Sequence, residues 1–423
     1  MNLKVFTAFS GYDSQCMALD RLHQHNPDFN YELVGWAEID KYAIQAHNAV
    51  YPQWADRNYG DISKIDWAQV PDFDLFTYSS PCQDFSQAGK QAGGTEGSGT
   101  RSSLLWECRR AILAKKPKYL LMENVAALVS QKFIRLFNAW QLELERYGYR
   151  NFAKVLNAKD YGVPQNRERI FMVSVLDEQA RYEFPDPMPL PLRLKDVLEP
   201  KVDERYYLKE SKDKRLAQIL KEQGDQIQEG DMLDTYNQQV LHDVAATVTT
   251  GIDSRRHHFV AVEPIHTDKE GNALCISSRY AKESHKKMLN NDNGYGSTLV
   301  AETYLPTAEG AIFKGREIKN GDGLYLSDSI DFFRGGLPGM SRALKSECCD
   351  AGVCIDYRIR KLTERECFRL MDVPEEYIDR IQAAGISRSQ QYKMAGNSIV
   401  VSCMYHIWRK LWIDTQIKTL TLF

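Results

Sequence analysis

A cysteine near residue 80 stands where a reactive thiol could work. Cys82 follows an apolar run at Asp74–Ser79 and precedes the glycine-rich stretch Gln87–Thr100. A thiol exposed between a strand end and a loop is typical of a nucleophile, because attack requires an accessible thiolate. The alternative is an inert, packed thiol, which most cysteines are.

Other groups that could take part in catalysis lie beside neighbouring apolar runs. Glu123 follows the run Tyr119–Met122, where burial could raise its pKa enough to hold a proton. Arg167 and Arg169 precede Ile170–Val175 and offer planar guanidinium groups suited to a carbonyl or phosphate. The residues alone leave open that one of these arginines simply pairs with an acid.

Three positions suggest an adenosine-containing ligand. Gly11 lies in the turn after the first apolar run, and Glu38 follows the second. An acid at that point can accept hydrogen bonds from ribose hydroxyls, and Asp61 could accept from an adenine amino group. Each acid could equally be a helix cap or a solvated charge.

The elements that must position these groups alternate along the first 176 residues. Apolar runs alternating with amphipathic stretches predict a parallel, doubly wound sheet flanked by helices, whose strand ends gather ligands. The expected strands are Leu3–Phe9, Glu32–Ala37, Asp74–Ser79, Tyr119–Met122 and Ile170–Val175. The expected helices are Ser14–His25, Lys41–Val50, Ser102–Lys115 and Lys132–Tyr147.

A proline-rich connector, Pro185 to Pro191, ends the alternating pattern and predicts a domain boundary. We expect a catalytic domain at 1–190 that is completed by 385–423, where Ser398–Trp412 reads as an apolar helix. A second, smaller domain with its hinge is expected at 191–384. Its pattern is weaker: a charged helix-like stretch at Glu204–Gln228 and short β-like pieces at Ala245–Thr250, His258–Val262 and Leu274–Ser278.

Composition narrows the class of protein. With 54 basic and 57 acidic residues the net charge is −3, which neither supports nor refutes binding to nucleic acid. No secretion signal or membrane-spanning run is apparent, and nine cysteines fit a reducing cytoplasm. Cys348, Cys349 and Cys354 lack paired spacing and a nearby histidine, so no metal site is predicted.

Taken in order, these segments resemble the DNA (cytosine-5) methyltransferase family. The similarity rests on Pro-Cys-Gln at Cys82, Glu-Asn-Val at Glu123 and Gln-x-Arg-x-Arg ending at Arg169. It continues at Arg360–Leu370 and Gly396–Val400, so it covers the first 176 and the last 65 or so residues. The resemblance implies a Rossmann-like, S-adenosylmethionine-dependent fold with a smaller target recognition domain.

The resemblance also assigns residues to roles. It implies an S-adenosylmethionine pocket at Phe9, Gly11, Glu38, Ile39, Asp61, Ile62, Leu104 and Asn397. It implies catalysis by Cys82, Glu123, Arg167 and Arg169, with Gln83 and Ser86 contacting DNA. The sequence departs from the family at Asp13 and Ser14, where a glycine pair is usual, and at Met371-Asp372-Val373, where Gln-Gly-Phe is usual.

By the same resemblance, Cys82 adds to carbon 6 of cytosine while Glu123 bonds N3 and the exocyclic amine, and Arg167 holds the ring carbonyl. The base must leave the duplex stack to be reached, and the loop Ala88–Thr100 is expected to close on the DNA. Leu192–Asp356 would then read bases in the major groove. Candidate readers, each of which could instead be a surface loop residue, are Arg255, Arg256 and Arg279.

Three other functions stay open. A tRNA cytosine-5 methyltransferase would use the same cysteine chemistry, but the long middle segment favours duplex DNA as the partner. A catalytically silent DNA-binding protein is disfavoured by intact Cys82, Glu123 and Arg167. A Rossmann-type oxidoreductase is disfavoured by the incomplete glycine fingerprint at Gly11. We expect a cytoplasmic monomer without membrane contact, and the sequence does not tell whether a cognate restriction endonuclease exists.

Overall fold

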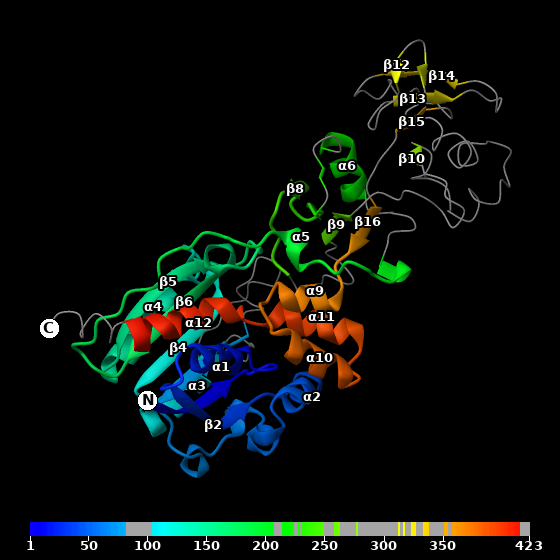
Figure 1. Ribbon diagram of the computed structural model, residues 1–423. Coiled ribbons are helices and arrows are strands. Elements are labelled where there is room, and N and C mark those ends of the chain that lie inside the picture. Colours follow the sequence, from blue (N-terminus) through cyan, green and yellow to red (C-terminus); the bar gives the residue numbers. More distant parts are fainter. Residues whose placement is uncertain are drawn as a thin grey trace. The chain divides into compact units, whose positions relative to one another are not determined.

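The computed structural model divides the chain into two compact units (Figure 1). Unit 1 comprises Met1–Arg193, Thr247–Asp253 and Glu364–Phe423, and unit 2 comprises Leu194–Ala246 and Ser254–Thr363. The residues that the structure describes are 1–81, 104–206, 214–223, 227–228, 230–248, 258–262, 276–277, 312–313, 316–317, 323–326, 333–337, 351–353 and 358–414.

Unit 1 is built on a six-stranded sheet of order β2-β1-β3-β4-β6-β5. Its strands are β1 (Asn2–Ala8), β2 (Asn30–Ala37), β3 (Leu75–Tyr78), β4 (Tyr119–Val125), β5 (Arg150–Asn157) and β6 (Glu168–Val175). The first four run parallel, whereas β6 runs antiparallel to β4 and pairs with β5 as a hairpin. The expectation of an entirely parallel sheet was therefore wrong at this edge, because no crossover helix separates β5 from β6.

The helices that follow the parallel strands are α1 (Ser14–His25), α2 (Lys41–Val50), α3 (Glu107–Lys115) and α4 (Ile134–Arg146). Short 3-10 turns lie in the connecting segments at η1 (Pro52–Arg57), η2 (Ile62–Lys64), η3 (Trp67–Gln69), η5 (Ala126–Val129) and η6 (Ala158–Tyr161). Asp13 and Asp40 cap α1 and α2, and both helices have the predicted bounds.

Alternate strand residues form one face of the hydrophobic core. Phe6, Phe76 and Met122 belong to a buried cluster that also contains Ile112 of α3 and Trp140 of α4. Side chains on alternate positions of a strand point to opposite faces of the sheet. Because Phe6 and Ala8 point into this cluster, Thr7 points to the other face. There α1 lies beside the last helix of the chain (Figure 1).

The last part of unit 1 is helical: α9 (Glu364–Arg369), α10 (Glu375–Ala383), α11 (Arg388–Asn397), α12 (Val401–Arg409) and a π-helical turn, η9 (Lys410–Asp414). Trp412 stacks on Trp408 and on Phe29, which anchors this end of the chain to the unit. No described helix combines the length and apolar character needed to cross a membrane.

Unit 2 has short elements. Its helices are α5 (Leu194–Val197), η7 (Glu204–Tyr206) and α6 (Lys214–Gln223). One four-stranded sheet contains β16 (Arg358–Lys361), β9 (His258–Val262), β7 (Met232–Asp234) and β8 (Gln239–Leu241). The other strands are β10 (Ile276–Ser277), β11 (Ile312–Phe313), β12 (Arg316–Glu317), β13 (Gly323–Leu326), β14 (Phe333–Leu337) and β15 (Ala351–Val353).

Candidate active site

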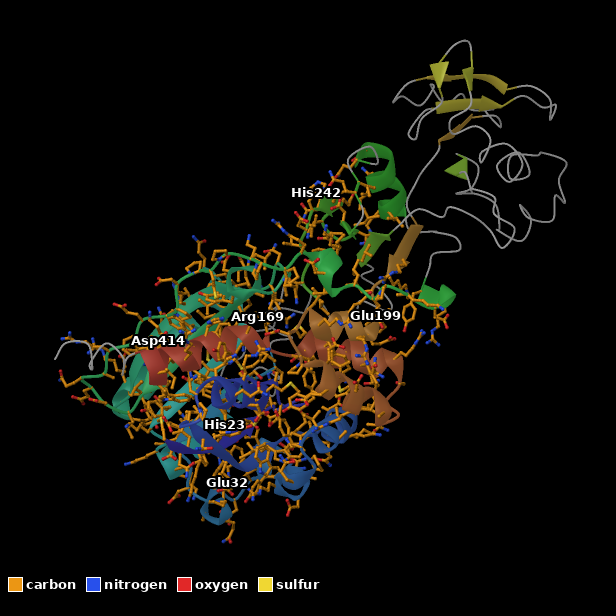
Figure 2. All side chains as sticks on the ribbon, in the orientation of Figure 1. His23, Glu32, Arg169, Glu199, His242 and Asp414 are labelled. Atoms are coloured by element: carbon orange, nitrogen blue, oxygen red, sulfur yellow. The ribbon has the colours of Figure 1, made fainter. Side chains whose placement is uncertain are left out.

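A buried carboxyl group lies beside a guanidinium at the end of β4. Glu123 is 7% exposed, and its Oε1 is 3.2 Å from Nε of Arg169. Arg169, which is labelled in Figure 2, lies at the start of β6. Burial raises the pKa of Glu123, and the opposing pull of Arg169 and Arg167 is weaker. A carboxyl group in this setting can hold a proton for donation to a bound base.

The antiparallel direction of β6 brings these two residues together. In the sheet register Arg169 pairs with Val125 and Phe171 pairs with Glu123. A parallel strand would have carried Arg169 to the opposite edge of the sheet. The strand direction that the sequence pattern did not predict is thus the reason that the predicted acid and arginine meet.

Arg167 has a different environment, although it is only two residues from Arg169. It is 3% exposed, and its guanidinium donates to the carbonyl oxygens of Val248 (2.9 Å), Gly396 (3.1 Å) and Ser398 (2.7 Å). These bonds hold the guanidinium on main-chain oxygens. The arginine beside the acid is Arg169.

Gln165 makes further fixed contacts in the same loop, although the sequence motif to which it belongs predicted no role for it. Its side chain is fully buried, donates to the carbonyl of Leu370 and accepts from the amide of Val248 at 3.0 Å. The Gln-x-Arg spacing was its only signal in the sequence. Gln165 and Arg167 together join the segment at Val248 to the C-terminal helices of unit 1.

The turn after β3 is tied to the end of β4. Asn124 donates to the carbonyl and to the hydroxyl of Ser80, at 3.2 and 3.4 Å. Ser80 comes two residues before Cys82, which lies outside the described residues. The predicted DNA contacts Gln83, Ser86, Arg255, Arg256 and Arg279 also lie outside them, as does the loop Ala88–Thr100.

Glu38, which directly follows β2, supports the turn after β1. Its carboxylate accepts from the amides of Gly11 (3.0 Å), Ile39 (2.8 Å) and Asp40 (2.8 Å). Gly11 has φ +60°, and a Cβ there would meet no atom within 4 Å. Because Gly11 borders open space, a ligand can approach its main chain closely.

The remaining predicted cofactor residues differ in exposure. Ile39 is 71% exposed and Asn397 is exposed at the end of α11, whereas Ile62 is buried in the core. Phe9 and Leu104 are partly buried and pack against the core cluster. Ile62 therefore belongs to the core, whereas the exposed Ile39 presents an apolar side chain that a planar ring could contact.

Asp61 is set up as a charged acceptor. Its Oδ1 accepts from the hydroxyl of Ser63 at 2.8 Å and from the Ser63 amide at 3.0 Å, and these bonds lower the pKa of Asp61. Its other oxygen, Oδ2, lies 3.7 Å from Nζ of Lys64, and the side chain is partly exposed. An amino group is a matching ligand.

Among the described residues no group of three or more His, Cys, Asp or Glu side chains could hold an ion. Cys348, Cys349 and Cys354, for which no metal site was predicted, lie outside those residues.

Comparison with known proteins identifies relatives along almost the whole chain. The family model "C-5 cytosine-specific DNA methylase" matches residues 3–412. The orphan methyltransferase M.SPRI of Bacillus phage SPR is 30% identical, with 98% of each chain covered. The type II methyltransferase M2.ScrFI of Lactococcus lactis subsp. cremoris is 38% identical, over 49% of this chain and 70% of its own length.

Solved structures agree on the fold. The Entamoeba histolytica methyltransferase EhMeth superposes with a TM-score of 0.58 at 14% identity, covering 98% of this chain and 99% of its own. The S. pombe Dnmt2 methyltransferase gives a TM-score of 0.54 at 15% identity and covers 99% of each chain. At these identities the likeness shows a shared architecture and no more.

Proposed function

The chain belongs to the C-5 cytosine-specific DNA methylase family, and on that premise we propose that it methylates carbon 5 of cytosine within a specific duplex DNA sequence through a covalent adduct on Cys82. The observation that carries the proposal is the buried Glu123 beside Arg169, at the strand end to which Asn124 ties Ser80. An acid, a positive charge and the residues leading to a cysteine meet there.

Chain connectivity supports a role for Cys82. It follows Ser80 by two residues, and two residues of extended chain span at most about 7 Å. The thiol is therefore tethered to the edge that holds Glu123. A short tether of this kind limits the search for a reactive geometry.

The chemistry requires a nucleophile, because carbon 5 of cytosine is too electron-poor to attack a methyl group unaided. The Cys82 thiolate adds to carbon 6, and the ring electrons move toward N3 as Glu123 supplies a proton there. The resulting enamine has a nucleophilic carbon 5. Methyl transfer to carbon 5 leaves S-adenosylhomocysteine as the product of the donor. A base then removes the carbon-5 proton, the carbon–sulfur bond breaks so that the thiolate leaves, and the N3 proton returns to Glu123.

The role of the ring-carbonyl donor, which sequence analysis assigned to Arg167, we assign instead to Arg169. Arg169 lies beside Glu123, and its side chain is 17% exposed. A guanidinium at this point can stabilise negative charge on the ring carbonyl. Arg167, bonded to three main-chain oxygens, instead holds Ser398 and its neighbours in place.

The cofactor side fits S-adenosylmethionine, which when bound supplies an electrophilic methyl group. Glu38 Oε2 accepts one main-chain bond and can also accept from a ribose hydroxyl. Ile39 would contact the adenine ring and Asp61 its amino group, while Gly11 leaves room for the ligand backbone. Phe9, Leu104 and Asn397 would complete the lining.

The segments outside the described residues would handle DNA. We assign Gln83, Ser86 and the loop Ala88–Thr100 to the backbone around a flipped cytosine, and Arg255, Arg256 and Arg279 to target recognition. The protein would act as a cytoplasmic monomer. Names of relatives include type II and orphan methyltransferases, so a cognate restriction endonuclease would accompany this chain only in the first case.

Expression in a host that lacks cytosine methylation tests the proposal. Sequencing of the host DNA for 5-methylcytosine should show methylation at one short recurrent sequence, and its absence with Cys82→Ala. Host tRNA from the same cells is the second arm. Methylation of tRNA with unmodified DNA, or of neither, would overturn the proposal.

A further inference from the structure

The turn between β1 and α1 is held in an unusual main-chain conformation. Phe9, Gly11 and Asp13 all have positive φ, at +57°, +60° and +67°. Left-handed geometry is rare for residues other than glycine, although aspartate tolerates it better than most. At Asp13 and Ser14, where the family resemblance leads one to expect glycines, side chains are therefore free to make contacts that glycine cannot.

Asp13 uses that freedom fully. Its carboxylate has no solvent exposure, accepts from the amide of Cys16 at 3.3 Å and from the hydroxyl of Thr7 at 3.0 Å, and lies 3.4 Å from Nε2 of the buried His47. His47 in turn stacks on Trp36, with ring centroids 3.7 Å apart. One carboxylate thus contacts β1, the first turn of α1 and, through His47, α2.

These contacts lead directly to the cofactor turn. The Asp13 amide donates to the carbonyl of Ser10 at 2.8 Å, and the Ser10 hydroxyl lies 2.8 Å from that of Thr7. The turn enclosed between Ser10 and Asp13 contains Gly11, whose amide donates to Glu38. The Asp13 amide therefore closes the turn that carries Gly11, and the Asp13 carboxylate is linked to the Ser10 end of that turn through the hydroxyl of Thr7.

Ser14 makes a matching contact on the other side. Its hydroxyl oxygen lies 3.2 Å from Oγ of Ser398, the residue after Asn397. Arg167 holds the carbonyl of the same Ser398 at 2.7 Å. Asp13 thus links the turn after β1 to α2 through His47, and Ser14 links it to Ser398 at the end of α11.

We infer that Asp13 is a positioning residue for the adenosine-containing cofactor. Its buried carboxylate contacts Thr7, Cys16 and His47 and so holds the turn in shape. Glycine has no side chain and could not make these contacts. The inference rests on the proposed function. It leads to an expectation opposite to the family pattern, namely that restoring glycine at position 13 weakens cofactor binding.

Calorimetric titration of the full chain with S-adenosylmethionine tests this, comparing wild type with Asp13→Gly and Asp13→Asn. Loss of a hydrogen-bonded carboxylate should raise the Kd of Asp13→Gly about tenfold. KM for the cofactor should rise by a similar factor while kcat at saturation changes little. Asp13→Asn keeps an acceptor oxygen and tolerance of positive φ, so it should fall between the two.

Asp66→Gly is the matched control, since it removes the aspartate cap of η3 from a turn that makes no part of the proposed site. Its Kd should equal that of wild type. Wild-type affinity in Asp13→Gly would overturn the inference, and if that variant does not fold, wild-type affinity in Asp13→Asn would do so. Failure of the wild type itself to bind S-adenosylmethionine would instead contradict the proposed function.

Discussion

Two carboxylates at the same edge of the central sheet, Glu38 and Glu123, have opposite surroundings. Glu38 accepts from three main-chain amides, those of Gly11, Ile39 and Asp40. Glu123 is buried next to one guanidinium, and burial raises its pKa. The first arrangement suits a fixed acceptor, and the second suits a group that gives and takes a proton, so one edge serves two different tasks.

Replacing Glu123, the acid proposed to contact the cytosine ring, should have the largest effect on catalysis. Glu123→Gln keeps the shape but loses the transferable proton, so kcat should fall by about 10²–10⁴-fold. The Kd for S-adenosylmethionine should stay within about twofold. Single-turnover methyl transfer to duplex DNA measures the first and calorimetry the second, with the exposed Glu145→Gln as control. A kcat near that of wild type would remove the distinction between the two carboxylates.

The two arginines around the start of β6, Arg167 and Arg169, should differ in whether their loss affects catalysis or stability. Arg169→Ala should lower kcat by about 10²–10³-fold with little change in thermal stability. Arg167→Ala should lower the free energy of unfolding by about 1–3 kcal/mol, because it leaves buried carbonyls without their donor. Denaturant titration and initial rates, measured on both variants, decide the matter. The reverse pattern would return the ring-carbonyl role to Arg167.

On the cofactor side, Glu38→Gln should have a smaller and different effect. The amide still accepts on one oxygen but places a donor opposite the amide groups that it faces, so the Kd for S-adenosylmethionine should rise about tenfold. The kcat at saturating cofactor should change little. A Glu38→Gln variant that loses kcat but binds the cofactor normally would show that Glu38 acts on the cytosine ring rather than on the cofactor.

The dependence of stability on pH should show the smallest effect, and it reveals whether the pKa of Glu123 is raised or lowered in the folded protein. Its pKa in the folded protein is raised above the ordinary value of 4.5, so the folded state binds the proton more tightly than the unfolded state. This contribution is fully present below pH 4.5 and is lost as pH rises through the folded pKa. Relative to Glu123→Gln, wild type should therefore lose stability with rising pH, and urea titrations between pH 4 and 8 would measure it. Wild type that instead gains stability relative to Glu123→Gln as pH rises would contradict a raised pKa.

The parts of the fold predicted correctly are those with strong local signals. The bounds of α1 and α2 follow from aspartate caps and helical spacing, and both were predicted to the residue. The strand β5 was missed. Much of it is exposed at the edge of the sheet, and Arg150–Asn157 lacks the apolar run that identifies buried strands.

The candidate site shows the same limit more sharply. Sequence spacing identified Glu123, Arg167 and Arg169, but it could not tell which arginine faces the acid. That distinction depends on the antiparallel pairing of β6 and on carbonyl groups more than 80 residues away along the chain, at Val248 and Ser398. Contacts of that kind leave no local pattern.

The most direct test of covalent catalysis by Cys82 is a trapping experiment with duplex DNA that contains 5-fluorocytosine at the methylated position. Fluorine at carbon 5 prevents the final loss of a proton, so the carbon–sulfur bond should persist. In the presence of S-adenosylmethionine we expect a stoichiometric adduct that peptide mass spectrometry places on Cys82 and that Cys82→Ala abolishes. Normal methylation of ordinary cytosine without any such adduct, or an adduct on a different cysteine, would contradict it.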